Sequence, residues 1–240
     1  MIFTVKNQTR LTETVYRLTL TGDTSAIVRP GQFVQLQLPG FYLRRPISVC
    51  DWDADTLTLI YKVVGEGTKA MTALQPGAAL DLLTGLGNGF DTACCGDKPL
   101  LVGGGVGLPP LHGLCKTLLR EGKHPHIVMG FNTASEVFLE AEFRALNVPV
   151  TVTTADGTCG MKGFVTAALP GLDFDSTFAC GPEPMLRALY NATDKPGQYS
   201  FEARMACGFG ACMGCTCQTK YGAKRICKDG PVLQKEEIVW

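Results

Sequence analysis

Four cysteines near the end of the chain have the spacing best suited to chemistry. Cys207, Cys212 and Cys215 follow a C-x4-C-x2-C pattern, and Cys227 lies further along. This is the spacing of plant-type 2Fe–2S ligation, with three thiolates on one tight loop and a fourth from elsewhere. Glycines between the ligands allow positive φ and leave backbone N–H groups free to point at sulfur. We predict that these four cysteines hold a 2Fe–2S cluster.

A structural zinc site is the alternative for the same four cysteines. Zinc knots usually pair two short cysteine units, whereas here three candidate ligands share one glycine-rich loop and the fourth is alone. The pattern therefore favours the cluster. Cys217 would point to the other side of an extended segment from Cys215, so we predict that it is not a ligand. The chain has 11 cysteines, an odd number, and a disulfide framework is not expected. Five cysteines outside the cluster segment are interpreted as small buried hydrophobic residues, namely Cys50, Cys94, Cys95, Cys115 and Cys159.

A second candidate site begins in an arginine–proline run. Arg45, Pro46, Ile47 and Ser48 lie on a predicted strand, where Arg45 is able to pair with a phosphate and the Ser48 hydroxyl to reach a ring nitrogen. Taken alone, an Arg-Pro pair in a β domain is usually structural. A glycine and a hydroxyl follow at Gly67 and Thr68, at the start of a helix predicted over 68–74. A helix N-terminus of this kind is suited to a pyrophosphate.

A third candidate site is a glycine-rich turn between a strand and a helix. Gly104, Gly105 and Gly107 follow an apolar strand. Glycines in this position allow a second pyrophosphate to approach the backbone closely. A plain glycine-rich turn is the alternative. Cys180 and Gly181 also end a predicted strand before a helix. Cys180 is placed to face a nicotinamide, although on its own it is better explained as a buried thiol.

The elements that must position these residues change character near residue 95. Residues 1–95 contain short strands of β-forming residues separated by glycines, which predicts an antiparallel β-barrel. In residues 96–202 strands and helices alternate, which predicts an α/β domain with a parallel sheet and crossover helices. Residues 203–240 are a small Cys/Gly-rich segment. The strands are expected at 15–20, 33–38, 56–61, 100–102, 126–129, 150–153 and 177–180, and the helices of the second domain at 108–120, 137–146 and 183–192.

Composition limits the possible partners. Lys+Arg and Asp+Glu are both 22, so neither nucleic acid nor an anionic membrane is expected as the main partner. The N-terminus lacks the order of a signal peptide, and the longest apolar stretch is interrupted by glycines and prolines. We expect a soluble, cytoplasmic protein.

Taken in order, the motifs resemble the ferredoxin–NAD(P) reductase superfamily along almost the whole chain. The resemblance implies that Arg45–Ser48, Gly67-Thr68 and the strand residues Ile60, Tyr61 and Lys62 contact FAD. It also implies that Gly104, Gly105 and Gly107, together with Cys180 and Gly181, contact a nicotinamide cofactor. The cysteine loop at the C-terminal end resembles, more closely, that of the electron-transfer subunits of NAD-linked dihydroorotate dehydrogenases.

This closer resemblance implies a partner and an electron route. The partner is an FMN-containing dihydroorotate dehydrogenase catalytic subunit, in a heterotetramer of two chains of each kind, acting in pyrimidine biosynthesis. Electrons are expected to run from the partner's FMN to the 2Fe–2S cluster, to FAD and then to NAD+. Protein groups position and tune the cofactors, and no acid–base catalyst is assigned. The alternatives are an equivalent subunit of a sulfide dehydrogenase or of a ferredoxin-dependent NAD(P) reductase complex, and a non-enzymatic zinc-stabilised binding module.

Two further expectations concern specificity and docking. No Lys or Arg occurs between residues 128 and 143, where a 2′-phosphate would need one, so NAD is expected rather than NADP. The loop 208–214 carries Phe209, Ala211 and Met213 between the cysteines. These residues either shield the cluster from water or form an interface with the partner, and we favour the interface.

Overall fold

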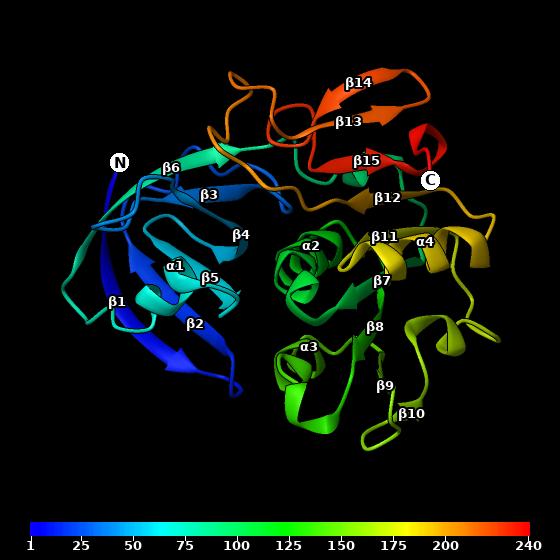
Figure 1. Cartoon of the computed structure of the whole chain (residues 1–240). Helices are drawn as coiled ribbons and strands as arrows, with labels where there is room; N and C mark the ends of the chain where they lie inside the picture. Colours follow the sequence, from blue (N-terminus) through cyan, green and yellow to red (C-terminus); the bar gives the residue numbers. More distant parts are fainter.

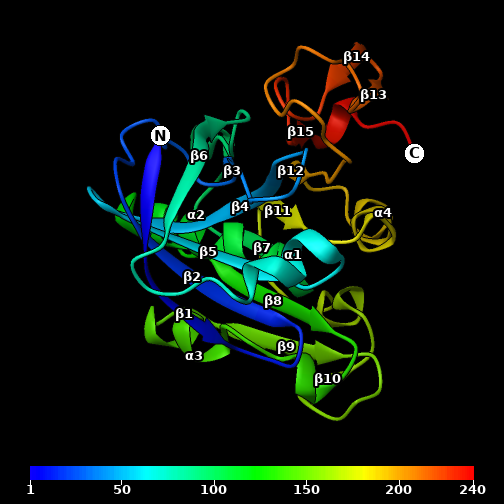
Figure 2. The same cartoon turned by 60° about the vertical axis from the view of Figure 1, so that its left-hand side comes forward.

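The computed structural model describes residues 1–240 in three connected parts (Figure 1). A β-barrel in blue and cyan lies on one side, and a sheet with helices in green and yellow lies on the other. The orange and red C-terminal segment lies across one end of both. After a 60° turn the barrel lies in front of the green sheet, and the orange and red segment remains at the top (Figure 2). The fold class predicted from the sequence is confirmed.

The barrel is closed by six antiparallel strands in the order β1-β2-β5-β4-β3-β6. Its interior is filled by aliphatic and aromatic side chains that alternate along the strands. One short helix follows β5. The bounds are β1 Ile2–Arg10, β2 Val15–Thr21, β3 Phe33–Leu36, β4 Arg45–Trp52, β5 Thr56–Lys62, α1 Glu66–Met71 and β6 Ala79–Leu86.

Strand β3 shows this alternation and turns one face toward the C-terminal segment. Val34 and Leu36 belong to the barrel interior. Phe33, on the opposite face, belongs to a separate apolar cluster that also contains Cys215 and Cys227. The outer face of β3 is thus covered by the segment that carries the four candidate cluster ligands.

The second sheet has seven strands in the order β10-β9-β8-β7-β11-β12-β15. The first six are parallel, and β15 runs antiparallel to β12. The strands are β7 Pro99–Gly104, β8 His126–Phe131, β9 Val150–Thr154, β10 Met161–Lys162, β11 Ser176–Cys180, β12 Gly197–Ser200 and β15 Val232–Gln234. The helices are α2 Leu108–Arg120, α3 Glu140–Ala145 and α4 Glu183–Ala192. No helix of the structure has both the length and the hydropathy needed to span a membrane.

Helix α2 joins the barrel to this sheet. It packs against β4 so closely that a Cβ at Gly113 would lie 2.9 Å from the carbonyl oxygen of Cys50. One apolar cluster accordingly contains Val15 and Ile60 of the barrel together with Leu111 and Leu114 of the helix. The barrel and the sheet therefore share a continuous core, which fixes the groove between them.

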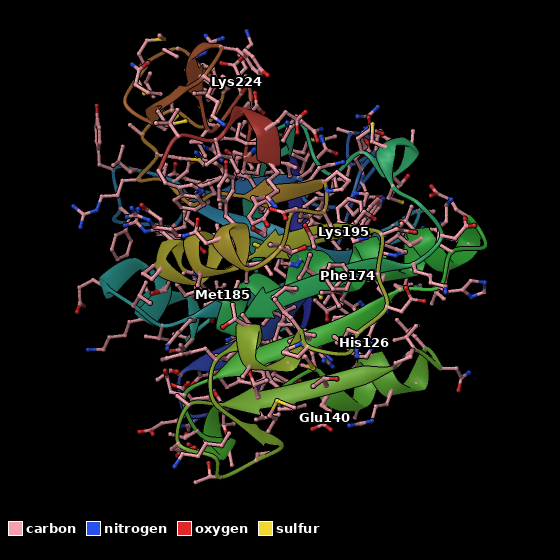
Figure 3. All side chains as sticks on the ribbon, turned by 90° about the vertical axis from the view of Figure 1, so that its right-hand side faces the viewer. His126, Glu140, Phe174, Met185, Lys195 and Lys224 are labelled. Carbon is pink, nitrogen blue, oxygen red and sulfur yellow. The ribbon has the colours of Figure 1, made fainter.

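The C-terminal segment is tied to both parts. It forms a hairpin of β13 Thr216–Thr219 and β14 Gly222–Arg225 before β15 enters the large sheet. Asn88, in the connection between barrel and sheet, donates a hydrogen bond from Nδ2 to the carbonyl of Val232 at 2.7 Å and accepts one at Oδ1 from its N–H at 3.1 Å. Figure 3, viewed from the side of the large sheet, shows Lys224 of this segment above the strands and Glu140 of α3 below them.

Candidate functional site

A first cavity, of about 530 Å³, opens between the barrel and the chain that follows β12. It is lined by residues from β4, β5 and α1 on the barrel side. Phe201 and Met205 line it from the other side. Most of the residues that the sequence predicts to contact a flavin line this cavity. They are Arg45, Pro46, Ile47, Ser48, Ile60, Tyr61, Lys62 and Thr68. The structure thus brings three separated motifs together around one space.

Arg45 lies across the start of α1, beside Gly67. A Cβ at Gly67 would lie 1.9 Å from Nε of Arg45, so only glycine leaves room for this guanidinium. The guanidinium lies 4.9 Å from the ring centre of Phe41 and donates from Nη1 to the carbonyl of Leu43 at 2.7 Å. A cation held at this edge of the cavity is suited to a phosphate group.

Thr68 has a more local role than the sequence suggested. Its hydroxyl accepts hydrogen bonds from the N–H groups of Val64 and Gly65, at 2.9 and 3.1 Å, and donates to the carbonyl of Gly65 at 3.0 Å. The hydroxyl therefore holds the turn that begins α1, a helix of only six residues. The side chain lines the cavity and shapes its wall.

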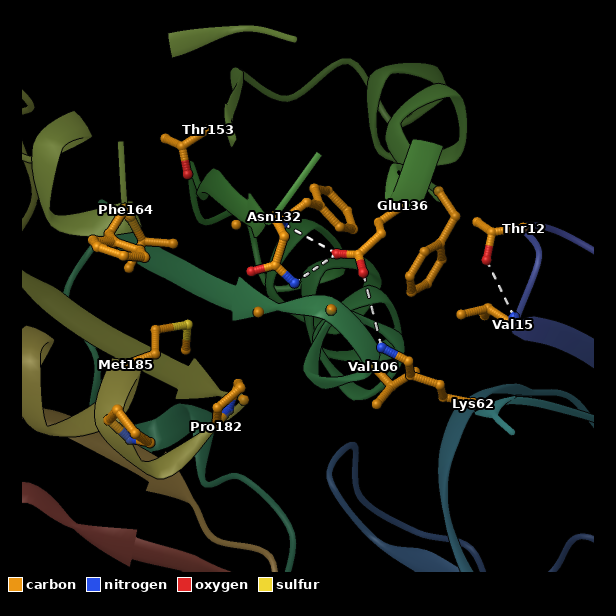
Figure 4. Close-up of a pocket in the computed structure, with 18 of the residues that line it drawn as sticks. Thr12, Val15, Lys62, Val106, Asn132, Glu136, Thr153, Phe164, Pro182 and Met185 are labelled. Atoms are coloured by element: carbon orange, nitrogen blue, oxygen red, sulfur yellow. Dashed lines mark hydrogen bonds and ion pairs between the residues drawn. The ribbon is translucent and has the colours of Figure 1, made fainter. Parts of the chain in front are cut away.

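A second cavity, of about 620 Å³, lies where β7, β8 and β11 end at their carboxyl edge (Figure 4). Gly104, Gly105 and Gly181, all predicted from the sequence, line it. Asn132 and Glu136 lie at one side of the cavity, and Phe164 and Met185 at the other. The carboxyl edge of a parallel sheet is where open α/β folds bind nucleotides.

Gly107 and Cys180 lie against each other where α2 begins beside the end of β11. Gly107 lines neither; a Cβ there would lie 2.0 Å from the carbonyl oxygen of Cys180, so the glycine lets α2 begin against the end of β11. Cys180 lines the first cavity rather than the second, and burial raises the pKa of its thiol to about 12. It is therefore a neutral thiol at neutral pH.

The two cavities adjoin. Lys62, Val106 and Glu202 line both of them. Hydride transfer between two ring cofactors, one bound in each cavity, would need adjoining sites of this kind, because the reacting atoms must come into contact.

The four predicted cluster ligands form two neighbouring pairs. The N–H of Cys212 donates to Sγ of Cys207 at 3.4 Å, and the N–H of Cys227 donates to Sγ of Cys215 at 3.4 Å. Two neighbouring pairs of cysteines fit a two-iron centre with two thiolates for each iron.

Hydrogen-bond donors surround the first of these sulfurs. Burial raises the pKa of Cys207, but backbone N–H groups of Cys212, Phe209 and Ala211 outweigh it and lower the pKa to about 6. Burial and the neighbouring Cys215 raise the pKa of Cys227 to about 12. The loop conformation thus favours a thiolate at Cys207, the state in which cysteine binds iron.

Several residues that line the two cavities carry no recognisable signal in the sequence. Phe201 and Met205 line the first cavity from a stretch without a recognisable motif. Phe138, Phe164 and Met185 line the second cavity, and they read in the sequence as ordinary core residues. Asn132 and Glu136 were detectable, because they follow a predicted strand whose carboxyl end had to face the nucleotide.

A closed barrel joined to a mostly parallel α/β sheet, with a cavity on each side of their junction, defines the class of flavin-dependent reductases of the ferredoxin–NAD(P) reductase type. The chain superposes with a TM-score of 0.90 and 29% identity on a solved structure described under "flavin-based electron bifurcation via the NADH-dependent reduced ferredoxin-NADP oxidoreductase structure"; the match covers 100% of this chain and 90% of the other. An iron–sulfur cluster binding domain of dihydroorotate dehydrogenase B matches residues 202–239.

Curated relatives narrow the class to one family. The electron transfer subunit of dihydroorotate dehydrogenase B (NAD(+)) from Geobacillus thermodenitrificans is 43% identical, over 98% of this chain and 97% of that protein. The subunits of the same name from Bacillus pumilus and Fusobacterium nucleatum are 41% and 39% identical, each over 98% of this chain and 96% of theirs. The chain belongs to the family of electron transfer subunits of dihydroorotate dehydrogenase B.

Proposed function

We propose that this chain passes electrons between an FMN-containing dihydroorotate dehydrogenase catalytic subunit and NAD+. The observation that carries the proposal is the contact between the two cavities, which share Lys62, Val106 and Glu202, in a chain that also holds two pairs of cysteines. FAD is assigned to the first cavity, the nicotinamide cofactor to the second, and a 2Fe–2S cluster to the cysteines. Together these groups would supply carriers of one electron and of a hydride.

The residues of the chain have binding and positioning roles in this proposal. Arg45 pairs with the flavin's phosphates, and the apolar residues Ile47 and Ile60 line the wall of the first cavity. Gly104 and Gly105 let the dinucleotide approach the backbone at the end of β7. No side chain is assigned as a proton donor or acceptor.

The catalytic subunit is proposed to dock at the cluster loop. Phe209 and Met213, between the ligands, are 55% and 54% exposed. Two large apolar side chains exposed on one short loop suit an interface better than they suit solvent. The two-plus-two stoichiometry proposed for the complex rests on the family resemblance alone.

A reconstitution experiment tests the function. The chain is co-produced with the catalytic subunit, purified, and assayed for reduction of NAD+ on addition of dihydroorotate. We expect reduction by the complex and none by either subunit alone. Reduction driven by sulfide or by reduced ferredoxin, but not by dihydroorotate, would favour the equivalent subunits of those complexes instead.

A further inference from the structure

Three glutamines are buried in this protein, and one of them differs from the other two. Gln32 accepts at Oε1 from the N–H of Val28 at 2.8 Å and donates from Nε2 to the carbonyl of Gly87 at 3.1 Å. Gln198 likewise bonds through both amide atoms. Gln35 is 0% exposed, and neither its Nε2 nor its Oε1 has a partner within the chain.

An amide buried in this way needs an external partner. Leaving a buried donor or acceptor unpaired is destabilising, and native proteins rarely tolerate it. An apolar side chain of similar shape would avoid that cost.

The amide points at the cluster loop. Gln35 follows Phe33 by two positions on β3, so both side chains lie on the outer face that the C-terminal segment covers. A Cβ at Gly208 would lie 1.8 Å from Nε2 of Gln35, which places the amide directly against this glycine. Gly208 has φ +78° and follows Cys207, the first ligand of the loop.

Gln35 also stands between the two redox sites. Its backbone pairs with Pro46 of β4, and Pro46 lines the first cavity. The strand thus presents its backbone toward the flavin-binding strand and its side-chain amide toward the cysteine loop. No other buried side-chain amide in the protein lacks hydrogen-bond partners.

We propose that Nε2 of Gln35 donates a hydrogen bond to an inorganic sulfide of the bound 2Fe–2S centre. A donor in this position stabilises the more negative, reduced state of the centre and raises its reduction potential. Gln35 therefore tunes the potential from the barrel, outside the ligand loop. The inference rests on the proposed cluster at Cys207, Cys212, Cys215 and Cys227.

The test is a redox titration of the full chain, in which the electron paramagnetic resonance signal of the reduced cluster is the readout. Gln35→Met keeps the length of the side chain and removes both polar atoms. We expect the equilibrium constant for cluster reduction to fall about tenfold, a shift of about 59 mV to more negative potential for a one-electron couple. Gln35→Glu replaces the donor by an acceptor and should shift the potential further in the same direction.

Gln32→Met is the matched control, because it removes a buried amide from the same barrel that is fully paired within the chain. It should lower stability and leave the potential unchanged. The proposal is overturned if Gln35→Met and Gln35→Glu both retain the wild-type potential, or if Gln32→Met shifts it equally. Absence of a cluster signal in the wild-type chain would instead refute the assigned cluster itself.

Discussion

The carboxylate of Glu136 accepts two hydrogen bonds from Asn132, one from its side-chain amide at 2.9 Å and one from its backbone N–H at 3.1 Å. Its other oxygen lies 4.0 Å from Nζ of Lys62, which reaches across from the barrel (Figure 4). A negative charge is thereby fixed at the wall of the second cavity, and the one nearby cation on this side is paired with it.

This arrangement predicts a preference for NADH over NADPH. The carboxylate would repel a 2′-phosphate. Glu136→Gln should raise the ratio of specificity constants, NADPH over NADH, about tenfold, which corresponds to about 1.4 kcal/mol. Steady-state kinetics with an artificial acceptor measures the ratio. Glu140→Gln is the control, because Glu140 is a carboxylate in an ion pair with Arg144 on α3, and the ratio should not change in this variant. A wild-type chain that prefers NADPH would contradict the prediction.

The cysteine pairs predict which thiols the cluster needs. Cys227→Ser should lose most of the iron and the associated visible absorbance, because it removes one of four thiolates. Cys217→Ser should retain both, since Cys217 lies on β13 outside the two pairs. Iron analysis of the two purified variants decides the matter. Loss of iron in Cys217→Ser with retention in Cys227→Ser would show that the ligand set is wrong.

The exposed cluster loop predicts where the catalytic subunit binds. Met213→Asp should weaken the complex at least about tenfold, because it places a charge in the apolar part of an interface. Oxidation of NADH by artificial dyes in the isolated chain should persist. Met161→Asp is a matched control, since Met161 is also exposed but lies on β10, at the opposite edge of the large sheet from β15. Equal affinity of the Met213 and Met161 variants would place the interface elsewhere.

A buried histidine predicts how stability changes with pH. Burial lowers the pKa of His112, on α2; Asp51 and Glu142 oppose this, and Lys116 and Arg17 reinforce it. The unfolded chain therefore takes up a proton at a higher pH than the folded chain. Stability should fall as the pH drops below about 6.5, by no more than about 1.4 kcal/mol per pH unit for this one proton.

Denaturant unfolding between about pH 7 and pH 5 measures this slope. His112→Gln should reduce it, while the exposed His124→Gln should leave it unchanged. His126 contributes in the same direction, because burial lowers its pKa too, so part of the slope should remain in the His112 variant. An identical slope in wild type and His112→Gln would contradict the prediction.

Much of the fold was accessible from the sequence because its signals are local. The helices at 108–120 and 183–192 match α2 and α4, where apolar periodicity and an early proline agree. The helix expected at 137–146 is shorter, at Glu140–Ala145, since a 3₁₀ turn and an extended residue precede it. Strands β1, β6, β10 and β12 were not predicted, because barrel closure and pairing along a sheet edge depend on contacts between distant residues.

The residues of the candidate site likewise fall into those with a local sequence signal and those without one. Runs of neighbouring residues such as Arg45–Ser48 and the cysteine loop carry their own pattern, and the structure brings each of them to a cavity or a pair of thiols. Gln35 carried no signal, because a glutamine on a strand is unremarkable until its surroundings are known. The divisions at residues 95 and 202 stay predictions.

The position of β15 has a consequence for how the cysteines move. Residues 201–231, which carry all four candidate ligands, leave the large sheet at β12 and return to it at β15, the adjacent strand. The segment is therefore clamped at both ends, unlike a carrier domain on a flexible tether. Electron tunnelling falls off exponentially with distance, and here that distance would be set by the folded architecture rather than gated by a swinging arm.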